Sequence, residues 1–329
     1  MKPKEVIVSG MRPTGRLHLG HFFGVLKNWE RLQKQHQCYF FVADWHSLTT
    51  EYANIKVIQD ALCEIVIDWL AAGIDPEKAV LFVQSRVPEH AELHLLFSMI
   101  TPLGWLERVP SYKELQQELT GKDLSTYGFL GYPLLQTADV AVYKATQVPV
   151  GQDQVAHIEL AREIVRRFNY LYKVLFPEPA SLLAETPKLL GTDGRKMSKS
   201  YDNCIYLSDP EPEAEKKLMN CITDPARIRR QDPGNPDVCT VFSYHKLATP
   251  PETVRQIDGD CRTAKIGCID CKKILVKGLN ENLAPFRERR GEIVKKPKKV
   301  QEILADGTHT ARAVAQKTLS EVNEAMGLG

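Results

Sequence analysis

The stretch that decides the fold is VIVSGMRPTGRLHLGH, residues 6–21. It begins with a short apolar run, continues through a turn-prone segment, and opens a segment whose apolar positions recur at helical spacing to residue 32. This order predicts a strand, a loop and a helix N-terminus, which together favour anionic groups through free backbone N–H donors and the helix dipole. His18 and His21 are three residues apart, so both rings face the same side. Gly20 between them leaves room for a nucleotide base to approach the backbone.

Two further apolar runs, residues 39–43 and 79–83, have the continuous character of strands that are buried on both faces. A helical pattern over residues 55–70 separates them. This alternation predicts an α/β fold with a Rossmann-like parallel sheet and right-handed crossovers. Ligands bind at the carboxyl ends of such strands, which places a nucleotide beside the first loop. That loop lacks the Gly-x-Gly-x-x-Gly pattern, which argues against a nicotinamide enzyme of that type.

A second charged motif, KMSKS, occupies residues 196–200. Its lysines, Lys196 and Lys199, are again three residues apart, and the small polar residues and glycines around them predict a mobile loop over residues 191–202. Mobile cations suit a reaction in which negative charge develops on a leaving pyrophosphate. Each motif alone is common, but the two in this order behind a strand–loop–helix start indicate chemistry on a nucleoside triphosphate.

The character of the chain changes after the second motif, where charged helical patterns replace buried strands. We predict a Rossmann-like catalytic domain over residues 1–190, followed after the loop by a smaller all-helical domain over residues 203–307. The sequence Asp306-Gly307-Thr308 predicts a break and a helix N-cap. A last helix, residues 308–329, is then expected to pack back on the first domain.

Composition sets limits on location and partners. With 43% apolar and 26% charged residues, the chain has the balance of a globular protein. No apolar stretch approaches the ~20 residues that span a bilayer, and the N-terminal segment lacks the apolar core of a signal peptide. We therefore expect a cytoplasmic protein without a membrane partner. The formal net charge is only +2, so any nucleic acid must be held by local basic patches such as residues 227–230 or 295–299.

Residues 131–139, GYPLLQTAD, predict a pocket for an aromatic side chain. Pro133 suits the first position of a helix, and on that helix Tyr132, Gln136 and Asp139 fall on one face. An aromatic slot with a carboxylate at its end suits an aromatic amino acid that carries a polar hydrogen. The indole N–H of tryptophan and the phenol hydroxyl of tyrosine both meet this requirement, so the segment leaves both substrates open.

The motifs HLGH at residues 18–21 and KMSKS at residues 196–200 resemble the two defining motifs of the class I aminoacyl-tRNA synthetases. Five further segments resemble the bacterial tryptophanyl branch of that class: GMRPTG at 10–15, DWH at 44–46, VPVGQDQ at 148–154, HIEL at 157–160 and EAMGL at 324–328. The resemblance runs from end to end of the chain. It implies activation of L-tryptophan with ATP and Mg²⁺, transfer to tRNA(Trp), a homodimer, and a helical domain on the anticodon side of the tRNA.

The resemblance also implies roles for individual residues. Catalytic roles are implied for His18, His21, Lys196 and Lys199. Contacts with ATP are implied for Met11, Arg12, Thr14, Gly20, His21, Gly151, Asp153, Lys196, Met197, Ser198 and Lys199. Contacts with tryptophan are implied for Val8, Gly10, His46, Tyr132, Gln136, Asp139, Val148, Val150 and Gln154. Arg12 and Gln136 depart from the Gln and Met that many bacterial relatives carry at these positions.

Four of the eight cysteines are clustered: Cys239, Cys261, Cys268 and Cys271, with twenty-one, six and two residues between them. Four thiolates can complete a tetrahedral Zn²⁺ site or hold a [4Fe–4S] cluster, and spacing alone does not decide between the two. A subset of bacterial tryptophanyl-tRNA synthetases resembles this pattern and carries a [4Fe–4S] cluster, although its first gap is typically one residue longer. The resemblance therefore implies a structural [4Fe–4S] cluster at the anticodon-proximal end of the helical domain.

Three other interpretations stay open from the sequence. A tyrosyl-tRNA synthetase would share the fold and differ in the pocket. A non-catalytic, metal-stabilised RNA-binding protein descended from a synthetase would not need the histidines and lysines of the two motifs. A small-molecule nucleotidyltransferase could share the His-x-x-His start, but neither the helical domain nor the lysine motif. In the implied homodimer, the apolar stretch at residues 95–100 is the expected interface.

Overall fold

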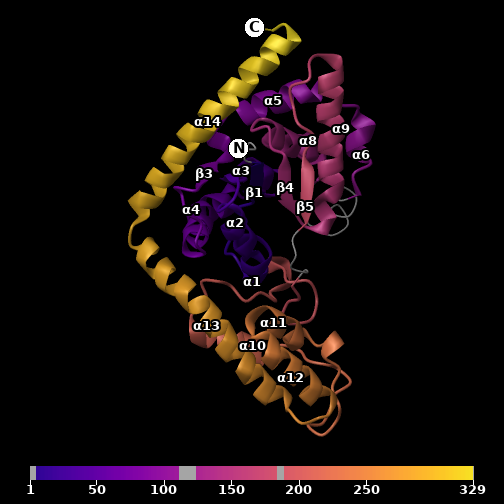
Figure 1. Cartoon of the computed structure of the whole chain (residues 1–329), viewed down its shortest axis with the longest axis vertical. Helices are drawn as coiled ribbons and strands as arrows, with labels where there is room; N and C mark the ends of the chain where they lie inside the picture. Colours follow the sequence, from indigo (N-terminus) through magenta and orange to yellow (C-terminus); the bar gives the residue numbers. More distant parts are fainter. Residues whose placement is uncertain (1–4, 111–123, 184–188, 329) are drawn as a thin grey trace.

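The computed structural model describes residues 5–110, 124–183 and 189–328. Within these ranges the molecule is elongated, with a five-stranded sheet toward one end and a group of helices at the other (Figure 1). The strands are β1 (Val6–Met11), β2 (Gln37–Val42), β3 (Ala79–Val83), β4 (Gln147–Val150) and β5 (Ala180–Leu183).

Helices make up most of the rest of the described chain. The α-helices are α1 (Leu19–His21), α2 (Lys27–Leu32), α3 (Asp44–Glu51), α4 (Ile55–Ala71), α5 (Glu89–Ser98), α6 (Leu103–Glu107), α8 (Tyr127–Ala141), α9 (Val155–Leu171), α10 (Glu211–Met219), α11 (Thr240–Ala248), α12 (Pro251–Arg262), α13 (Cys268–Val294) and α14 (Pro297–Met326). A π-helix covers Phe22–Leu26, and single 3-10 turns cover Gln84–Arg86, Gln152–Gln154, Lys199–Tyr201 and Pro236–Val238. In the part of the chain that the structure describes, no helix combines the length and the apolar character needed to cross a membrane.

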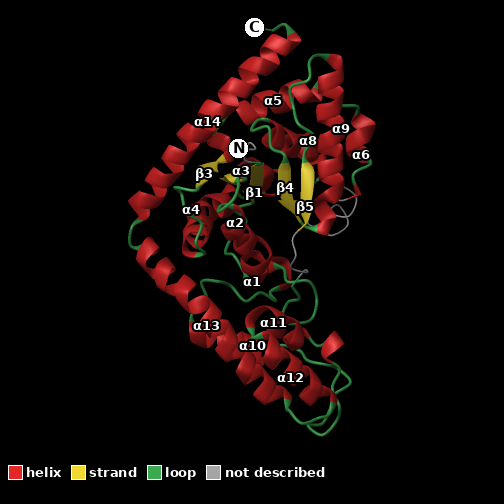
Figure 2. Cartoon of the chain, viewed as in Figure 1, coloured by secondary structure: helices red, strands yellow, loops and turns green. Residues whose placement is uncertain are grey.

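All strand pairs of the sheet are parallel, in the order β3-β2-β1-β4-β5 (Figure 2). The predicted α/β fold with a parallel sheet is therefore confirmed. The strand order reverses between β1 and β4, and such a switch point is where α/β sheets bind ligands. β1 pairs with β2 along its whole length, but its pairing with β4 is limited to Ile7 and Gln147. Pro149 in β4 has no N–H to donate to a ladder, and a crevice opens where the pairing stops.

The apolar character of the strands is explained by helices on both faces of the sheet. Consecutive residues of β2 divide between two hydrophobic clusters, as the alternation of a strand requires. Phe40 lies in the first cluster, where it stacks on Trp29 with ring centroids 4.2 Å apart. Tyr39 and Phe41 belong to the second cluster, on the opposite face. The strand is thus buried on both faces, as its sequence predicts.

The last helix differs from the prediction. α14 runs without a break from Pro297 to Met326, so the predicted break at residues 306–308 and the helix start at residue 308 are wrong. Gly307 lies inside α14 and against β3, where a β-carbon would stand 1.9 Å from the carbonyl oxygen of Leu81. The glycine is therefore a close contact between helix and sheet. Through this contact α14 packs along β3 and α5 (Figure 1).

We expect Gly307→Ala to lower the free energy of unfolding by about 2–3 kcal/mol, because its β-carbon displaces α14 from Leu81. Gly291→Ala is the matched control. Gly291 lies inside α13, where a β-carbon meets no neighbour within 4 Å, so this change should stabilise the protein by about 0.5–1 kcal/mol. Urea unfolding of both variants measures the difference. Equal stabilities would contradict the close contact at Leu81.

The helix α13 connects the helical end of the molecule with the sheet end, where it packs against α4 (Figure 1). Near its end, Arg290 Nε donates to Asp68 Oδ1 at 2.7 Å, and the same guanidinium pairs with Glu64. The preceding residue, Arg289, donates to the carbonyl oxygen of Ala71 at 2.6 Å. These bonds fasten the last two turns of α13 to α4.

Candidate active site

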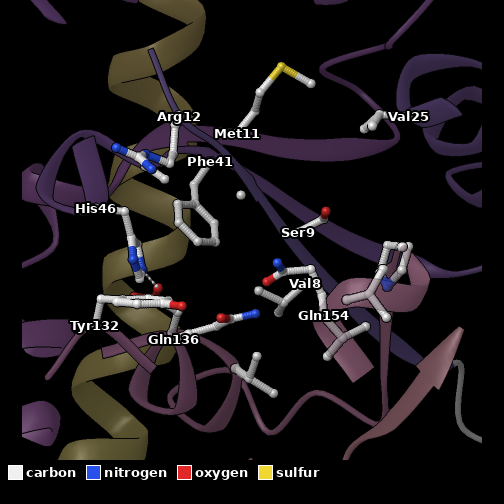
Figure 3. A pocket seen from close by; sticks show the side chains of 18 of the residues that line it. Val8, Ser9, Met11, Arg12, Val25, Phe41, His46, Tyr132, Gln136 and Gln154 are labelled. Atoms are coloured by element: carbon white, nitrogen blue, oxygen red, sulfur yellow. Dashed lines mark hydrogen bonds and ion pairs between the residues drawn. The ribbon is translucent and has the colours of Figure 1, made fainter. Parts of the chain in front are cut away.

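A pocket of about 500 Å³ lies at the carboxyl ends of β1 and β4, at the switch point of the sheet. Its size is typical of small-molecule sites. Figure 3 shows Arg12, His46 and Tyr132 along one side of this pocket. All nine residues predicted to contact the amino acid line it: Val8, Gly10, His46, Tyr132, Gln136, Asp139, Val148, Val150 and Gln154. The pocket therefore gathers this predicted set from β1, α3, α8, β4 and the turn after β4.

The residues predicted to contact ATP are divided. Five line the same pocket: Met11, Arg12, Thr14, His21 and Gly151. The others, with His18, are not among its lining residues: Gly20, Asp153, Lys196, Met197, Ser198 and Lys199. Several lining residues were not predicted from the sequence: Ser9, Val25, Phe41, Ala43, Thr49, Phe129, Val140 and Pro149. Most of these residues lie at strand ends or on helix faces next to predicted site residues. They could have been predicted from the sequence by including the neighbours of each predicted site residue at the carboxyl ends of the strands.

Gly10 shapes the apolar wall of the pocket. A β-carbon at this position would lie 2.5 Å from the ring of Phe41. The glycine thus lets the Phe41 ring lie against β1 and face the pocket (Figure 3). Val148 and Val150 of β4 add apolar side chains to the lining. This wall can accept a flat, apolar ring system.

Asp139 is a buried carboxylate that accepts hydrogen bonds at both oxygens. Oδ2 accepts from His46 Nε2 at 2.7 Å, and Oδ1 accepts from Gln84 Nε2 at 2.7 Å and His90 Nδ1 at 2.6 Å. Burial alone would raise the pKa of Asp139, but the charge and hydrogen bond of His46, with those of His90, hold it well below its usual range. Asp139 is therefore an ionised acceptor at one end of the pocket.

Tyr132 and Gln154 are linked through a histidine that the sequence did not single out as a site residue. The Tyr132 hydroxyl lies 3.0 Å from His157 Nε2, and His157 Nδ1 lies 2.6 Å from Gln154 Oε1. Burial, as the largest cause, lowers the pKa of His157 to about 4, so its ring is neutral at pH 7. A neutral ring that donates from Nδ1 to the Gln154 oxygen accepts at Nε2 from the Tyr132 hydroxyl. This link fixes the orientation of both pocket side chains.

The helix that carries Tyr132, Gln136 and Asp139 begins earlier than predicted. α8 starts at Tyr127 with the Thr126 side chain as its cap, so Pro133 stands inside the helix and not at its first position. The prediction for Pro133 is therefore wrong, because the helix start is set by the threonine cap six residues upstream of Tyr132. The shared face of Tyr132, Gln136 and Asp139 is unaffected, and all three side chains line the pocket.

The histidines of the first motif cap the helix that they begin. His18 Nδ1 accepts from the backbone N–H of Gly20 at 3.1 Å, and His21 Nδ1 accepts from that of His18 at 3.2 Å. A β-carbon on Gly20 would lie 2.9 Å from the His18 ring, so this glycine makes room for the cap. Burial and the nearby Lys199 lower the pKa of His18 to about 4, and burial also lowers that of His21. Both rings are neutral at pH 7 and act as hydrogen-bonding groups, not as cations.

The second motif is joined to the first loop through Lys199. Its Nζ donates to the carbonyl oxygens of Thr14 and Gly15, both at 3.0 Å. Lys196 is exposed, whereas the side chain of Met197 is buried in the core. The buried Met197 anchors the loop between the two lysines, and its predicted contact with ATP stays a prediction.

The four clustered cysteines lie at helix ends in the helical part of the molecule. Cys239 caps the start of α11, Cys268 and Cys271 stand in the first turn of α13, and Cys261 is in the last turn of α12. Burial, together with the charges of the other three, raises the pKa of the Cys271 thiol to about 12. Burial and neighbouring cysteines also raise the pKa of Cys239 and Cys261. The thiols are thus near enough to interact electrostatically, although no group of three or more potential metal ligands is assembled among the described residues.

Two contacts define the surroundings of the Cys261 sulfur. Arg227 Nη1 lies 3.8 Å from Cys261 Sγ and supplies a positive charge. A β-carbon on Gly234 would lie 2.7 Å from the same sulfur, so the glycine lets this sulfur pack against the backbone. Cysteines are the residue type that binds zinc or iron–sulfur groups as thiolates, and a nearby guanidinium favours the thiolate form.

The parallel sheet, the pocket at its switch point and the two motifs joined by Lys199 define a class I aminoacyl-tRNA synthetase. A family model described as "tRNA synthetases class I (W and Y)" matches residues 2–284, so the chain belongs to this class. The tryptophan–tRNA ligase of Thermotoga maritima is 55% identical over 324 residues, 98% of this chain and 99% of that protein. That of Aquifex aeolicus is 47% identical over 98% of this chain and 99% of its own length. The chain is thus a member of the bacterial tryptophanyl-tRNA synthetases.

A solved structure agrees with this assignment. The tryptophanyl-tRNA synthetase of Campylobacter jejuni, in complex with ADP and tryptophan, matches with a TM-score of 0.86 and 32% identity. The match covers 98% of this chain and 100% of that chain. The fold class and the family expected from the sequence are both confirmed.

Proposed function

We propose that this chain is a tryptophan–tRNA ligase that works in the cytoplasm. In the first step an oxygen of the tryptophan carboxylate attacks the α-phosphorus of Mg²⁺-bound ATP, the bond to the β-phosphate breaks, and pyrophosphate leaves. In the second step a ribose hydroxyl of tRNA(Trp) attacks the carbonyl carbon of the adenylate, and AMP leaves. The observation that carries this proposal is the pocket that has both the ionised Asp139 and His21 of the first motif among its lining residues.

The chain's own residues supply position and charge, and no side chain has to act as a nucleophile. The wall formed by Gly10 and Phe41 receives the indole ring, and Asp139 accepts its N–H. Neutral His18 and His21 donate hydrogen bonds to phosphate oxygens from their Nε2 atoms. Lys196 and Lys199 supply the positive charge that meets the leaving pyrophosphate. Mg²⁺ bound to ATP would neutralise part of the phosphate charge.

The test is amino-acid-dependent exchange of pyrophosphate into ATP by the purified chain, with tryptophan and tyrosine compared. Exchange with tryptophan alone, followed by charging of tRNA(Trp), is the expected result. Exchange with tyrosine would overturn the substrate and keep the reaction class. Exchange with neither amino acid would overturn the enzymatic function in favour of a non-catalytic RNA-binding protein.

The pH dependence of activation should report the charge of Lys199. Burial, together with the charge of Arg12, lowers the pKa of Lys199 to about 8, so in the free enzyme its ammonium is lost as the pH rises through that value. We expect kcat/KM for ATP to fall above about pH 8. Bound triphosphate favours the charged lysine, so kcat should fall only at a higher pH. Superimposable pH profiles of kcat and kcat/KM would contradict this assignment.

We further propose that Cys239, Cys261, Cys268 and Cys271 hold a [4Fe–4S] cluster. Its support is the set of four interacting thiols at the ends of α11, α12 and α13. The guanidinium of Arg227 adds a positive charge beside this set. When bound, such a cluster would link α11, α12 and α13 as a structural centre. These helices belong to the residues 203–307 that we assign to tRNA binding.

The metal content tests the cluster. The chain purified without oxygen is expected to carry about four iron and four sulfide ions and to absorb visible light. Cys271→Ser should lose the iron and lower the thermal stability, because the other three cysteines lose the cluster that they would bind together. Cys63→Ser, at an exposed cysteine, is the control and should keep the iron. One zinc ion and no iron in the unaltered chain would contradict the proposal.

A homodimer is proposed through α5, α6 and α8. Four apolar side chains on these helices or directly after α5 are each more than half exposed: Leu95 at 56%, Met99 at 69%, Leu103 at 57% and Tyr127 at 62%. Within the stretch at residues 95–100, Phe97 and Ile100 face the core instead, so only part of it is available to a partner. Exposed apolar side chains gathered on neighbouring helices are typical of an interface. Sedimentation equilibrium of the purified chain tests the dimer.

A further inference from the structure

The carboxylate of Asp139 has almost no spare acceptor capacity. An ionised carboxylate offers about four lone-pair positions. Gln84 and His90 take both positions on Oδ1, and His46 takes one on Oδ2. The one position that is left is on Oδ2. This oxygen is on the pocket side of the carboxylate, because its partner His46 lines the pocket, whereas His90 and Gln84 do not. The site therefore offers a ligand a single hydrogen-bond acceptor at this end.

The buried side of this network fixes which nitrogen of His90 carries the proton. His90 is fully buried, and its Nε2 lies 2.7 Å from the hydroxyl of Tyr143. The ionised carboxylate of Asp139 can only accept, so His90 carries a proton on Nδ1 and donates it to Oδ1. Burial raises the pKa of Tyr143 well above its usual value, so its hydroxyl keeps its proton and can donate to Nε2. Tyr39 holds the Tyr143 ring in place by stacking, with centroids 4.5 Å apart.

Gln84 is oriented by the same carboxylate. Its Nε2 donates to Asp139 Oδ1, while its side-chain oxygen has no hydrogen-bond partner among the described residues. The bond to Asp139 is thus the polar contact that sets the direction of this amide. Removing His90 would leave Gln84 as the one donor to Oδ1, and the carboxylate could then rotate or take up a proton.

We propose that His90 is a positioning residue for the choice of amino acid: it fixes Asp139 so that one acceptor position faces the pocket and fits a ring with one N–H donor. This inference rests on the proposed function. Indole has one N–H donor and no acceptor in the ring plane. The phenol oxygen of tyrosine also carries acceptor lone pairs. The donor beside Oδ2 is His46 Nε2, and it already donates to Asp139, so these lone pairs would be left without a donor there.

The test compares L-tryptophan with 3-benzothienyl-L-alanine, in which sulfur replaces the indole N–H without a large change of shape. The quantity measured is the ratio of their kcat/KM values in pyrophosphate exchange. In His90→Leu this ratio should fall by about tenfold or more, mainly through a higher KM for tryptophan. The KM for ATP should stay within about twofold. His90→Asn, whose amide can donate from the position of Nδ1, should keep the ratio within about threefold.

Tyr143→Phe provides a second variant in case His90→Leu does not fold. It keeps the aromatic ring and removes the hydroxyl that can donate to Nε2 of His90, and the ratio should fall by about threefold. An unchanged ratio in both His90→Leu and Tyr143→Phe, with both substrates slowed equally, would overturn the proposal and leave His90 a purely structural role. Lack of exchange by the unaltered chain with tryptophan would instead overturn the proposed function itself.

Discussion

Lys199→Met should exchange pyrophosphate into ATP about 10²–10³ times more slowly than the unaltered chain, which is the usual cost of removing a group that stabilises transition-state charge. Lys199 reaches from the second motif to the first loop, where it bonds to the carbonyl oxygens of Thr14 and Gly15. Since His18 and His21 are neutral, no positive charge comes from the first motif to replace it. The loss should therefore appear in kcat, measured at saturating tryptophan and ATP.

The matched control is Lys277→Met, the same change at a lysine whose side chain is 80% exposed on α13. It should leave kcat within about twofold, since a surface ion pair of this kind contributes little. A Lys199→Met chain with a raised KM for ATP and an unchanged kcat would contradict the prediction. That result would mean that Lys199 binds the triphosphate equally well before and during bond breaking.

The second large effect is expected at the other end of the pocket. Asp139→Asn should lower kcat/KM for tryptophan by about 10²-fold, because a hydrogen bond to a charged acceptor is lost and its replacement brings donors of its own. In asparagine one of the two carboxylate oxygens is replaced by an NH₂ group, which only donates. The donors His46, Gln84, His90 and the indole N–H now point at both oxygens, so at least one of them would face this NH₂ group. The KM for ATP should change little, because Asp139 is not among the residues that we expect to contact the triphosphate.

The outcome that would contradict this prediction is an Asp139→Asn chain that keeps its kcat/KM for tryptophan. Thermal unfolding of the variant should be measured alongside, because Gln84 and His90 are buried and would share one amide oxygen. A control at Gln136, as Gln136→Met, changes a pocket side chain on the same helix face without touching the carboxylate. It should leave the preference for tryptophan over tyrosine in place.

The strands of the sheet could be predicted where they contain continuous apolar runs. The runs at residues 39–43 and 79–83 are buried on both faces, so their sequence alone identifies β2 and β3. β4 and β5 have only four residues each; Pro149 interrupts the first, and the second is not fully buried at any position. Their pairing depends on the strands beside them, which a local pattern does not contain.

In the site, too, only the residues that are close in sequence could be predicted to lie together. Tyr132, Gln136 and Asp139 are close in sequence, so helical spacing alone puts them on one face. His90 on α5 and Gln84 in the turn after β3 reach Asp139 from 49 and 55 residues away, through contacts with α8 that tertiary packing creates. A single sequence carries no signal for such contacts. At Gly307 a local signal for a helix end was outweighed by packing, because the glycine is needed for contact with the sheet.

Because α13 is bonded to α4 near its C-terminal end, a small change of angle there would move its N-terminal end over a larger distance. The helix has 27 residues, or about 40 Å at 1.5 Å per residue. Cys268 and Cys271 stand in its first turn, in the part of the molecule where α13 packs against α10 and α11, and Arg289 and Arg290 hold its other end against α4. Cys268 lies 21 residues before Arg289, or about 32 Å along the helix, so a tilt of about 5° at the arginines would move the cysteine end by roughly 3 Å. The arginine bonds, together with the packing of α13 on α4, therefore relate the position of the cysteine end to that of the sheet.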